Sequence, residues 1–158
     1  MKTTDALLGG LAGAITLTLV HESLRRLVPD APRMDLLGMQ AIRKLLRNAD
    51  QPVPTEKTLF TAAMAGDLVG NGLYYGVGGL AADRDVVSKS AFLGLTAGVG
   101  ALLLPKPLGL SDAPSRRTTG TAVLTIALYT VGGLAAGIVM KALQARRCVA
   151  VPAGSLVL

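Results

Sequence analysis

The stretch that decides the fold is LFTAAMAGDLVGNGLYYGVGGLAA, residues 59–82. As a helix it rises far enough to cross a bilayer core of about 30 Å. On a helical wheel it has a polar face, a glycine face and an aliphatic face: Asp67, Asn71, Tyr74, Tyr75 and Gly78; Gly72, Gly76 and Gly79; and Val69, Leu73, Val77 and Leu80. Because only the aliphatic face suits lipid, we expect this helix to lie inside a bundle.

Composition supports a membrane protein. The 158 residues are 51% hydrophobic and only 16% charged, and the mean hydropathy of +0.51 is high for a soluble domain. The excess lies in four apolar runs, so we expect spans over residues 6–27, 59–82, 88–104 and 118–143, within one transmembrane domain covering residues 1–158. The net charge of +6 is carried by loops and aromatic residues are only 3%, which favours lipid headgroups over nucleic acid as partners.

The segment DLLGMQAIRKLLRN, residues 35–48, is too short to span. Its basic residues share one arc of the wheel, and we predict that Arg43, Lys44 and Arg47 contact anionic headgroups from an interfacial helix. The alternative is a short helix that caps the end of the bundle. The loops after the first and third spans hold ten Lys and Arg, against six on the opposite side. This bias predicts that the basic helix lies in the cytoplasm and both termini lie outside. The location that we expect is a bacterial inner (plasma) membrane.

The second and fourth spans resemble each other. Residues 65–82 match residues 119–136 at nine of eighteen positions without a gap. The polar face also maps, because Asp67, Asn71 and Tyr75 correspond to Thr121, Thr125 and Tyr129. We therefore predict an all-α integral membrane fold of four transmembrane helices, arranged as two parallel-repeat hairpins plus the amphipathic interfacial helix, with spans two and four facing each other.

Small residues four apart occur in every predicted span. The pairs are Gly9 and Gly13, Gly72 and Gly76, Gly94 and Gly98, and Gly133 and Gly137. Such spacing lets two helix backbones approach closely where burial of apolar groups gives no net drive. The sequence therefore predicts a tightly packed bundle.

Asp67 lies near the middle of its span, where an ionised carboxylate costs roughly 2.5–3.5 kcal/mol. A partner, water or a proton must compensate that cost. The predicted polar site has these members: Asp67, Asn71, Tyr75, Thr125 and Tyr129, with His21 and Glu22 at its mouth. It has two interpretations, a site for a proton, a cation or a small headgroup, and a hydrogen-bonded cluster that fixes helix packing. Pairing of Glu22 with Arg25 or Arg26 at the membrane surface is a further alternative.

Other motifs carry little chemistry. The sequence HESLR, residues 21–25, lacks the second histidine of the HExxH zinc pattern, and GVGGLA, residues 76–81, follows no strand. Cys148 is the sole cysteine and is expected to be a free thiol. We expect no cofactor and no metal, and enzymatic activity is not favoured.

Three function classes remain. The leading one is non-enzymatic binding or passage of a small polar or ionic species at Asp67. The second is a membrane-embedded enzyme that acts on lipid headgroups, with His21, Glu22 and Asp67 as acid or base. The third is a packing or assembly module without a ligand, whose glycine faces form a homo-oligomer.

Overall fold

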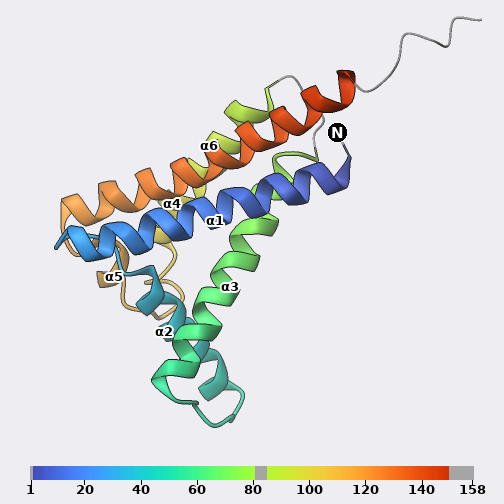
Figure 1. Ribbon diagram of the computed structural model, residues 1–158. Coiled ribbons are helices and arrows are strands. Elements are labelled where there is room, and N and C mark those ends of the chain that lie inside the picture. Colours follow the sequence, from blue (N-terminus) through green and yellow to red (C-terminus); the bar gives the residue numbers. More distant parts are fainter. Residues whose placement is uncertain (1, 81–84, 150–158) are drawn as a thin grey trace, which may run out of the picture.

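The computed structural model describes residues 2–80 and 85–149, with side chains described as far as residue 146. Every regular element in these residues is a helix (Figure 1): α1 (Thr3–Leu27), α2 (Met34–Asn48), α3 (Glu56–Val77), α4 (Val86–Leu103), α5 (Ala113–Arg116) and α6 (Thr119–Val149). The last two residues of the predicted second span, Arg84 in the charge count, and the Cys148 side chain lie outside the described part.

Local sequence explains where the helices begin and end. α1 stops at Leu27, two residues before Pro29, and α4 stops at Leu103 before Pro105, because proline cannot continue the helical hydrogen bonds. α3 begins after Thr55, whose side chain accepts a hydrogen bond from the Thr58 backbone N–H, as an N-cap residue does.

Three helices are long and apolar enough to cross a membrane, namely Thr3–Leu27, Val86–Leu103 and Thr119–Arg146. The chain is therefore a helical protein with the composition of a membrane protein. α3 has a comparable length of 22 residues, but Asp67 and Asn71 interrupt its apolar stretch and it is not one of the three.

α6 is the central helix, with α1 and α4 packed along it. Gly13 of α1 lies against Gly132, and Gly9 lies against Met140. On α4, Gly98 lies against Ile126 and Gly137 of α6 approaches Val87. In both pairs the residue numbers run in opposite directions, so α1 and α4 are each antiparallel to α6 and parallel to each other.

α3 packs against the first half of α1, where Gly10 meets Gly72 and Gly76. The two helices are antiparallel, because Gly76 lies by Ala6 while Gly72 lies by Leu11 and Ala14. α3 crosses α1 obliquely, so that its first turns and α2 stand away from α1 and α6 (Figure 1). All eight glycines of the predicted small-residue pairs lie at contacts between helices.

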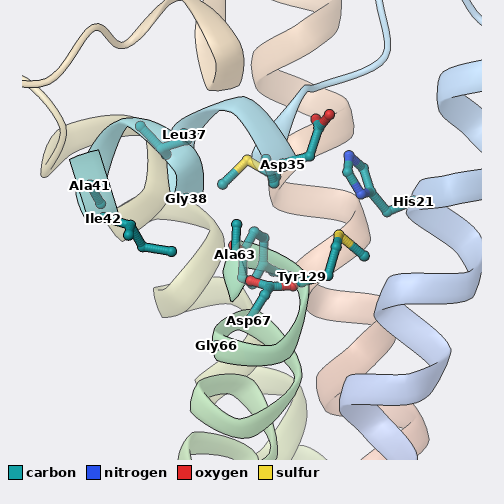
Figure 2. A pocket seen from close by; sticks show the side chains of 12 residues that line it. His21, Asp35, Leu37, Gly38, Ala41, Ile42, Ala63, Gly66, Asp67 and Tyr129 are labelled. Carbon is teal, nitrogen blue, oxygen red and sulfur yellow. The ribbon is translucent and has the colours of Figure 1, made fainter. Parts of the chain in front are cut away.

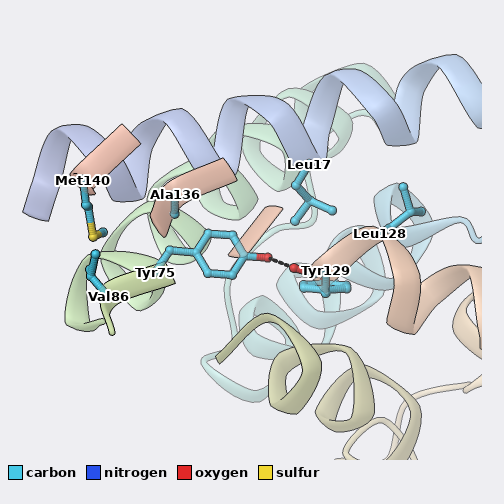
Figure 3. Close-up of a cluster of buried hydrophobic side chains, with 7 residues drawn as sticks. All are labelled: Leu17, Tyr75, Val86, Leu128, Tyr129, Ala136 and Met140. Atoms are coloured by element: carbon cyan, nitrogen blue, oxygen red, sulfur yellow. Dashed lines mark hydrogen bonds between the residues drawn. The ribbon is translucent and has the colours of Figure 1, made fainter. Parts of the chain in front are cut away.

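The buried centre of the bundle surrounds Tyr75 of α3 (Figure 3). Its side chain is fully buried, and its hydroxyl donates a hydrogen bond to the Tyr129 carbonyl of α6 over 2.9 Å. The members of the core are Leu17, Tyr75, Val86, Leu128, Tyr129, Ala136 and Met140. Tyr75 and Tyr129 occupy equivalent positions in the sequence repeat, so the repeat identifies two residues that do touch.

The predicted pairing of the second and fourth spans is nevertheless largely absent. α3 makes small contacts with α6 and α4, whereas α1 runs along α6 over much of its length. Under a twofold relation α3 and α4 would pack together as closely as α1 and α6 do. Gly13 and Gly132 let α1 approach α6 closely, and this contact takes the place of the expected one.

α2 lies on the first half of α3. Met39, Leu59 and Ala63 form a second buried cluster, and Gly38 lets the two backbones approach at Ala63. The opposite side of α2 keeps its basic residues at the surface, where Lys44 and Arg47 are exposed. α2 thus joins a packed apolar side to a basic outer side.

Candidate functional site

A cavity of about 310 Å³ lies where α2 covers the space between α1, α3 and α6 (Figure 2). Four polar side chains reach it, one from each helix: His21, Asp35, Asp67 and Tyr129. The rest of the wall is small or apolar, with Met34, Leu37, Gly38, Ala41, Ile42, Ala63, Met64 and Gly66. Ligand sites commonly combine an apolar wall with a few polar groups, and this volume is at the small end of their range.

Asp67 brings to this cavity a carboxyl group with a single hydrogen-bond partner in the protein. The Asn71 side-chain amide donates to Asp67 Oδ1 over 2.8 Å, from one turn further along α3. Within residues 2–80 and 85–146, no other group lies within hydrogen-bond or ion-pair distance of Asp67. An ionised carboxylate has room for about four donors, so Asp67 can accept further donors from a ligand.

Asp35, in contrast, is a buried carboxylate with full ionic compensation. Its Oδ2 lies 2.8 Å from Arg33 Nη2 and 3.4 Å from Arg25 Nη1. Burial penalises the charged form, but the hydrogen bonds and charge of Arg33 outweigh burial and hold the pKa of Asp35 below its usual value. The same pair raises the pKa of Arg33. Asp35 was not predicted as a site residue, because an acid in the first turn of a helix is common for electrostatic reasons alone.

The lowered pKa of Asp35 predicts a pH dependence of stability. Because the pKa falls below 3.8 on folding, the ion pair contributes fully above about pH 3.8 and is lost as pH falls through the folded-state value. We expect Asp35→Asn to lower the free energy of unfolding by about 1–2 kcal/mol at pH 7. Thermal unfolding of the wild type and Asp35→Asn in detergent from pH 7 to pH 3 checks this. The difference in stability between the two proteins should narrow only below pH 3.8. A difference that is constant down to pH 3 contradicts it.

His21 is buried and already has a partner. Its Nε2 lies 2.8 Å from the Pro32 carbonyl oxygen, and because a carbonyl only accepts, Nε2 carries the proton. Glu22 does not line the cavity. It forms an ion pair of 2.7 Å with Arg25, one of the two partners that the alternative interpretation names.

The remaining predicted site residues divide between cavity and core. Tyr129 lines the cavity, whereas Tyr75 lies in the core and faces no part of it. Thr125 is buried, and its hydroxyl lies 2.8 Å from the carbonyl oxygens of Ser115 and Thr121. Asn71 lines a neighbouring groove between α3 and α4, and its side-chain amide donates the hydrogen bond to Asp67. The structure therefore brings His21, Asp67 and Tyr129 together at the cavity, and Thr125 lines a small adjoining hollow with the same three residues.

The three predicted headgroup residues line a separate cleft beside the loop that follows α4. Arg43 pairs with Glu56 over 2.5 Å, and Lys44 donates to the Leu108 carbonyl over 2.7 Å. Arg47 has no polar partner among the described residues.

No group of three or more His, Cys, Asp or Glu side chains gathers as a metal-ligand set within the described residues. Comparison of the chain with protein-family models, curated proteins and solved structures finds no match. The chemistry of the site must therefore be argued from its own geometry.

Proposed function

We propose that this protein is a four-span membrane protein that binds a small organic cation at Asp67. The observation that carries the proposal is an unpaired carboxylate in a mostly apolar cavity. The three apolar helices do not by themselves decide whether α3 also crosses the membrane.

The packing directions support α3 as the fourth span. α1 and α4 are parallel, so the chain must return to its starting side between Leu27 and Val86. α3 is the long helix in that interval, and it runs antiparallel to α1. Its aliphatic face is also open, since Val69, Leu73 and Val77 are more than half exposed, as side chains that face lipid would be.

An even number of spans places both termini on one side of the membrane. The start of α1 and the end of α6 lie at the same end of the bundle (Figure 1). We expect reporters fused to each terminus to indicate the same side, outside by the distribution of Lys and Arg. Alkaline phosphatase and fluorescent-protein fusions in a bacterial host measure this. Termini on opposite sides would mean that α3 does not cross.

Charge at the cavity favours a cation. Glu22, Arg25, Arg33 and Asp35 form one connected network with two charges of each sign, so its net charge is zero. Asp67 adds a single negative charge close by. A cation at Asp67 would remove the cost of holding an isolated carboxylate away from water.

The wall of the cavity indicates what kind of cation fits. Met34, Ile42 and Met64 offer apolar surface to methyl or methylene groups. Tyr129 adds an aromatic ring, which attracts cations through its π-face. An inorganic ion would meet too few oxygen ligands, since Asp67 is the one unpaired carboxylate in the wall. A small alkylated amine or quaternary ammonium uses both the charge and the apolar wall.

Asp67→Asn tests the proposal directly. We expect tetramethylammonium or tetraethylammonium to raise the melting temperature of the purified protein by several degrees, as a ligand bound only by the folded state does. Asp67→Asn keeps the shape of the side chain but not its charge, and should lose most of this rise. Sodium chloride at equal ionic strength controls for screening.

Asp50→Asn is the matched control variant. Asp50 is an exposed acid between α2 and α3 with φ of 53°, a conformation that asparagine tolerates well. The rise in melting temperature that the quaternary ammonium ion causes in Asp50→Asn should equal the rise in the wild type. An equal rise in Asp67→Asn, or no rise in the wild type, would overturn the proposal.

The other two function classes have less support. An enzyme that uses His21 and Glu22 would need Glu22 in the cavity, where it is not. An assembly module would need free glycine faces. The eight glycines of the predicted pairs contact helices of the same chain, which leaves Gly66 and Gly70 of α3 as a pair with open space around it.

A further inference from the structure

A second hollow, apolar and open at the surface, lies where α3 and α4 diverge. It is a groove of about 440 Å³. Tyr74 of α3 and Ala97 and Gly100 of α4 form its walls, and Leu104 and Leu108 lie at one end. The Tyr74 hydroxyl is bonded to Thr96 over 2.9 Å, so the groove offers mainly apolar surface.

The basic cleft adjoins one end of this groove. Its volume is about 350 Å³, and its walls are the basic side of α2 and the loop at Gly109 and Leu110. Lys44 Nζ is held there by the carbonyl oxygens of Leu108 and Gly109. Arg47 has no protein partner in the described part of the chain. Two positive charges thus stand at the groove's end.

The two hollows share their walls. Leu110 lines both. α2 contributes Leu37 to the groove and Lys44 and Arg47 to the cleft, and these residues, at intervals of seven and three, follow one helix face. Gln40, between them, accepts a hydrogen bond from the Ser111 backbone N–H over 3.0 Å and so fixes the loop to α2. One face of α2 therefore changes from apolar beside the groove to basic beside the cleft, and the two adjoining hollows are together called the channel.

We infer that this channel binds one anionic phospholipid, with an acyl chain in the groove and the phosphate between Lys44 and Arg47. An occupant must be apolar over most of its length and negatively charged at one end, which is the chemistry of such a lipid. Arg43 is already neutralised by Glu56, so Lys44 and Arg47 supply the complementary charge. The inference uses the membrane placement proposed above and is independent of any ligand at Asp67.

The intrinsic tyrosine fluorescence of the protein can report a lipid bound in the groove. The chain has no tryptophan and three tyrosines, of which Tyr74 and Tyr129 line the groove. Lipids with brominated acyl chains quench tyrosine fluorescence on contact. The experiment reconstitutes the full chain in phosphatidylcholine vesicles that contain a small fraction of brominated phosphatidylglycerol or brominated phosphatidylcholine. We expect brominated phosphatidylglycerol to quench at roughly tenfold lower mole fraction, given two basic groups at the headgroup.

Arg47→Gln isolates the headgroup contact. Arg26→Gln is its matched control, because Arg26 is also an exposed arginine without a polar partner among the described residues and lies outside the cleft. We expect Arg47→Gln to reduce the preference for phosphatidylglycerol about threefold or more and Arg26→Gln to leave it unchanged. Equal effects of the two variants would indicate general attraction to the membrane and would overturn the site.

Gly100→Leu isolates the acyl-chain contact. A Cβ at Gly100 would meet just one atom, Leu104 Cδ1 at 3.5 Å, so leucine fits the fold while filling the groove. Gly70→Leu is the control, because nothing lies within 4 Å of a Cβ there and Gly70 is outside the groove. We expect Gly100→Leu to weaken quenching by brominated phosphatidylglycerol and Gly70→Leu not to do so.

Two other results overturn the inference. Equal quenching by both brominated lipids in the wild type would mean that no anionic lipid is selected. Weak quenching by both lipids, with a change of oligomeric state in Gly100→Leu by light scattering, would mean that a second copy of the chain covers the groove. Asp67→Asn should leave the quenching by both brominated lipids unchanged. Failure of the cation proposal is therefore distinguishable from failure of the lipid proposal.

Discussion

Replacing Gly133 by leucine is expected to abolish the folded bundle. A Cβ at this position would collide with the Ser90 carbonyl oxygen and would lie 3.0 Å from both Cα and N of Gly94. These are backbone atoms and cannot rotate away as a side chain would. α4 must then separate from α6 along the largest helix contact in the structure. Overpacking of a core costs roughly 1–3 kcal/mol even where neighbours can adjust, and here they cannot.

Size-exclusion chromatography and thermal unfolding in detergent measure the effect. We expect Gly133→Leu to give aggregated or unfolded protein. Gly70→Leu, with open space around its Cβ, should elute and melt within a few degrees of the wild type. A folded Gly133→Leu variant with a normal melting temperature would mean that α4 does not pack on α6 at this glycine.

The second large effect is expected for Tyr75, which fills the centre of the core (Figure 3). Tyr75→Ala removes a fully buried ring that packs against Gly13 and Gly132, and truncation of a buried aromatic costs roughly 3–5 kcal/mol. Tyr75→Phe keeps the ring and loses the hydrogen bond to the Tyr129 carbonyl. Such bonds inside membranes are worth about 0.6 kcal/mol.

Unfolding in mixed micelles of graded denaturing detergent compares the two variants with the wild type. The cost of Tyr75→Ala should exceed that of Tyr75→Phe severalfold. Similar costs for both would show that the hydroxyl, rather than the ring, holds α3 to α6.

The positions of the helices could be predicted from the sequence because each signal is local. Apolar runs and prolines place α1, α2, α4 and α6 close to residues 6–27, 35–48, 88–104 and 118–143. The second predicted span, residues 59–82, was set too late by three residues at its start, since the Thr55 cap begins α3 at Glu56, and it ran past the end of the helix at Val77. The glycine spacing likewise predicted contacts that the structure contains.

The site was harder to predict because it depends on how helices pair. The helical wheel placed Asp67 and Tyr75 on one polar face, but the oblique crossing of α3 turns Asp67 to the cavity and Tyr75 to the core. The sequence repeat suggested twofold packing, yet Gly13 lets α1 occupy the position beside α6. Asp35 reaches the cavity only because α2 folds back over α3, and no periodic pattern within α2 reports that.

In the membrane placement proposed above, the unequal lengths of the helices would constrain the surrounding bilayer. α4 has 18 residues and is about 27 Å long, against about 37 Å for the 25 residues of α1. In a bilayer with a hydrocarbon core of about 30 Å, α4 leaves a shortfall of about 3 Å on its side of the bundle alone. Adjacent lipids compensate such hydrophobic mismatch by local thinning. In that placement the two sides of the bundle differ in hydrophobic thickness, and we expect short-chain lipids to pack beside α4 at the least energetic cost.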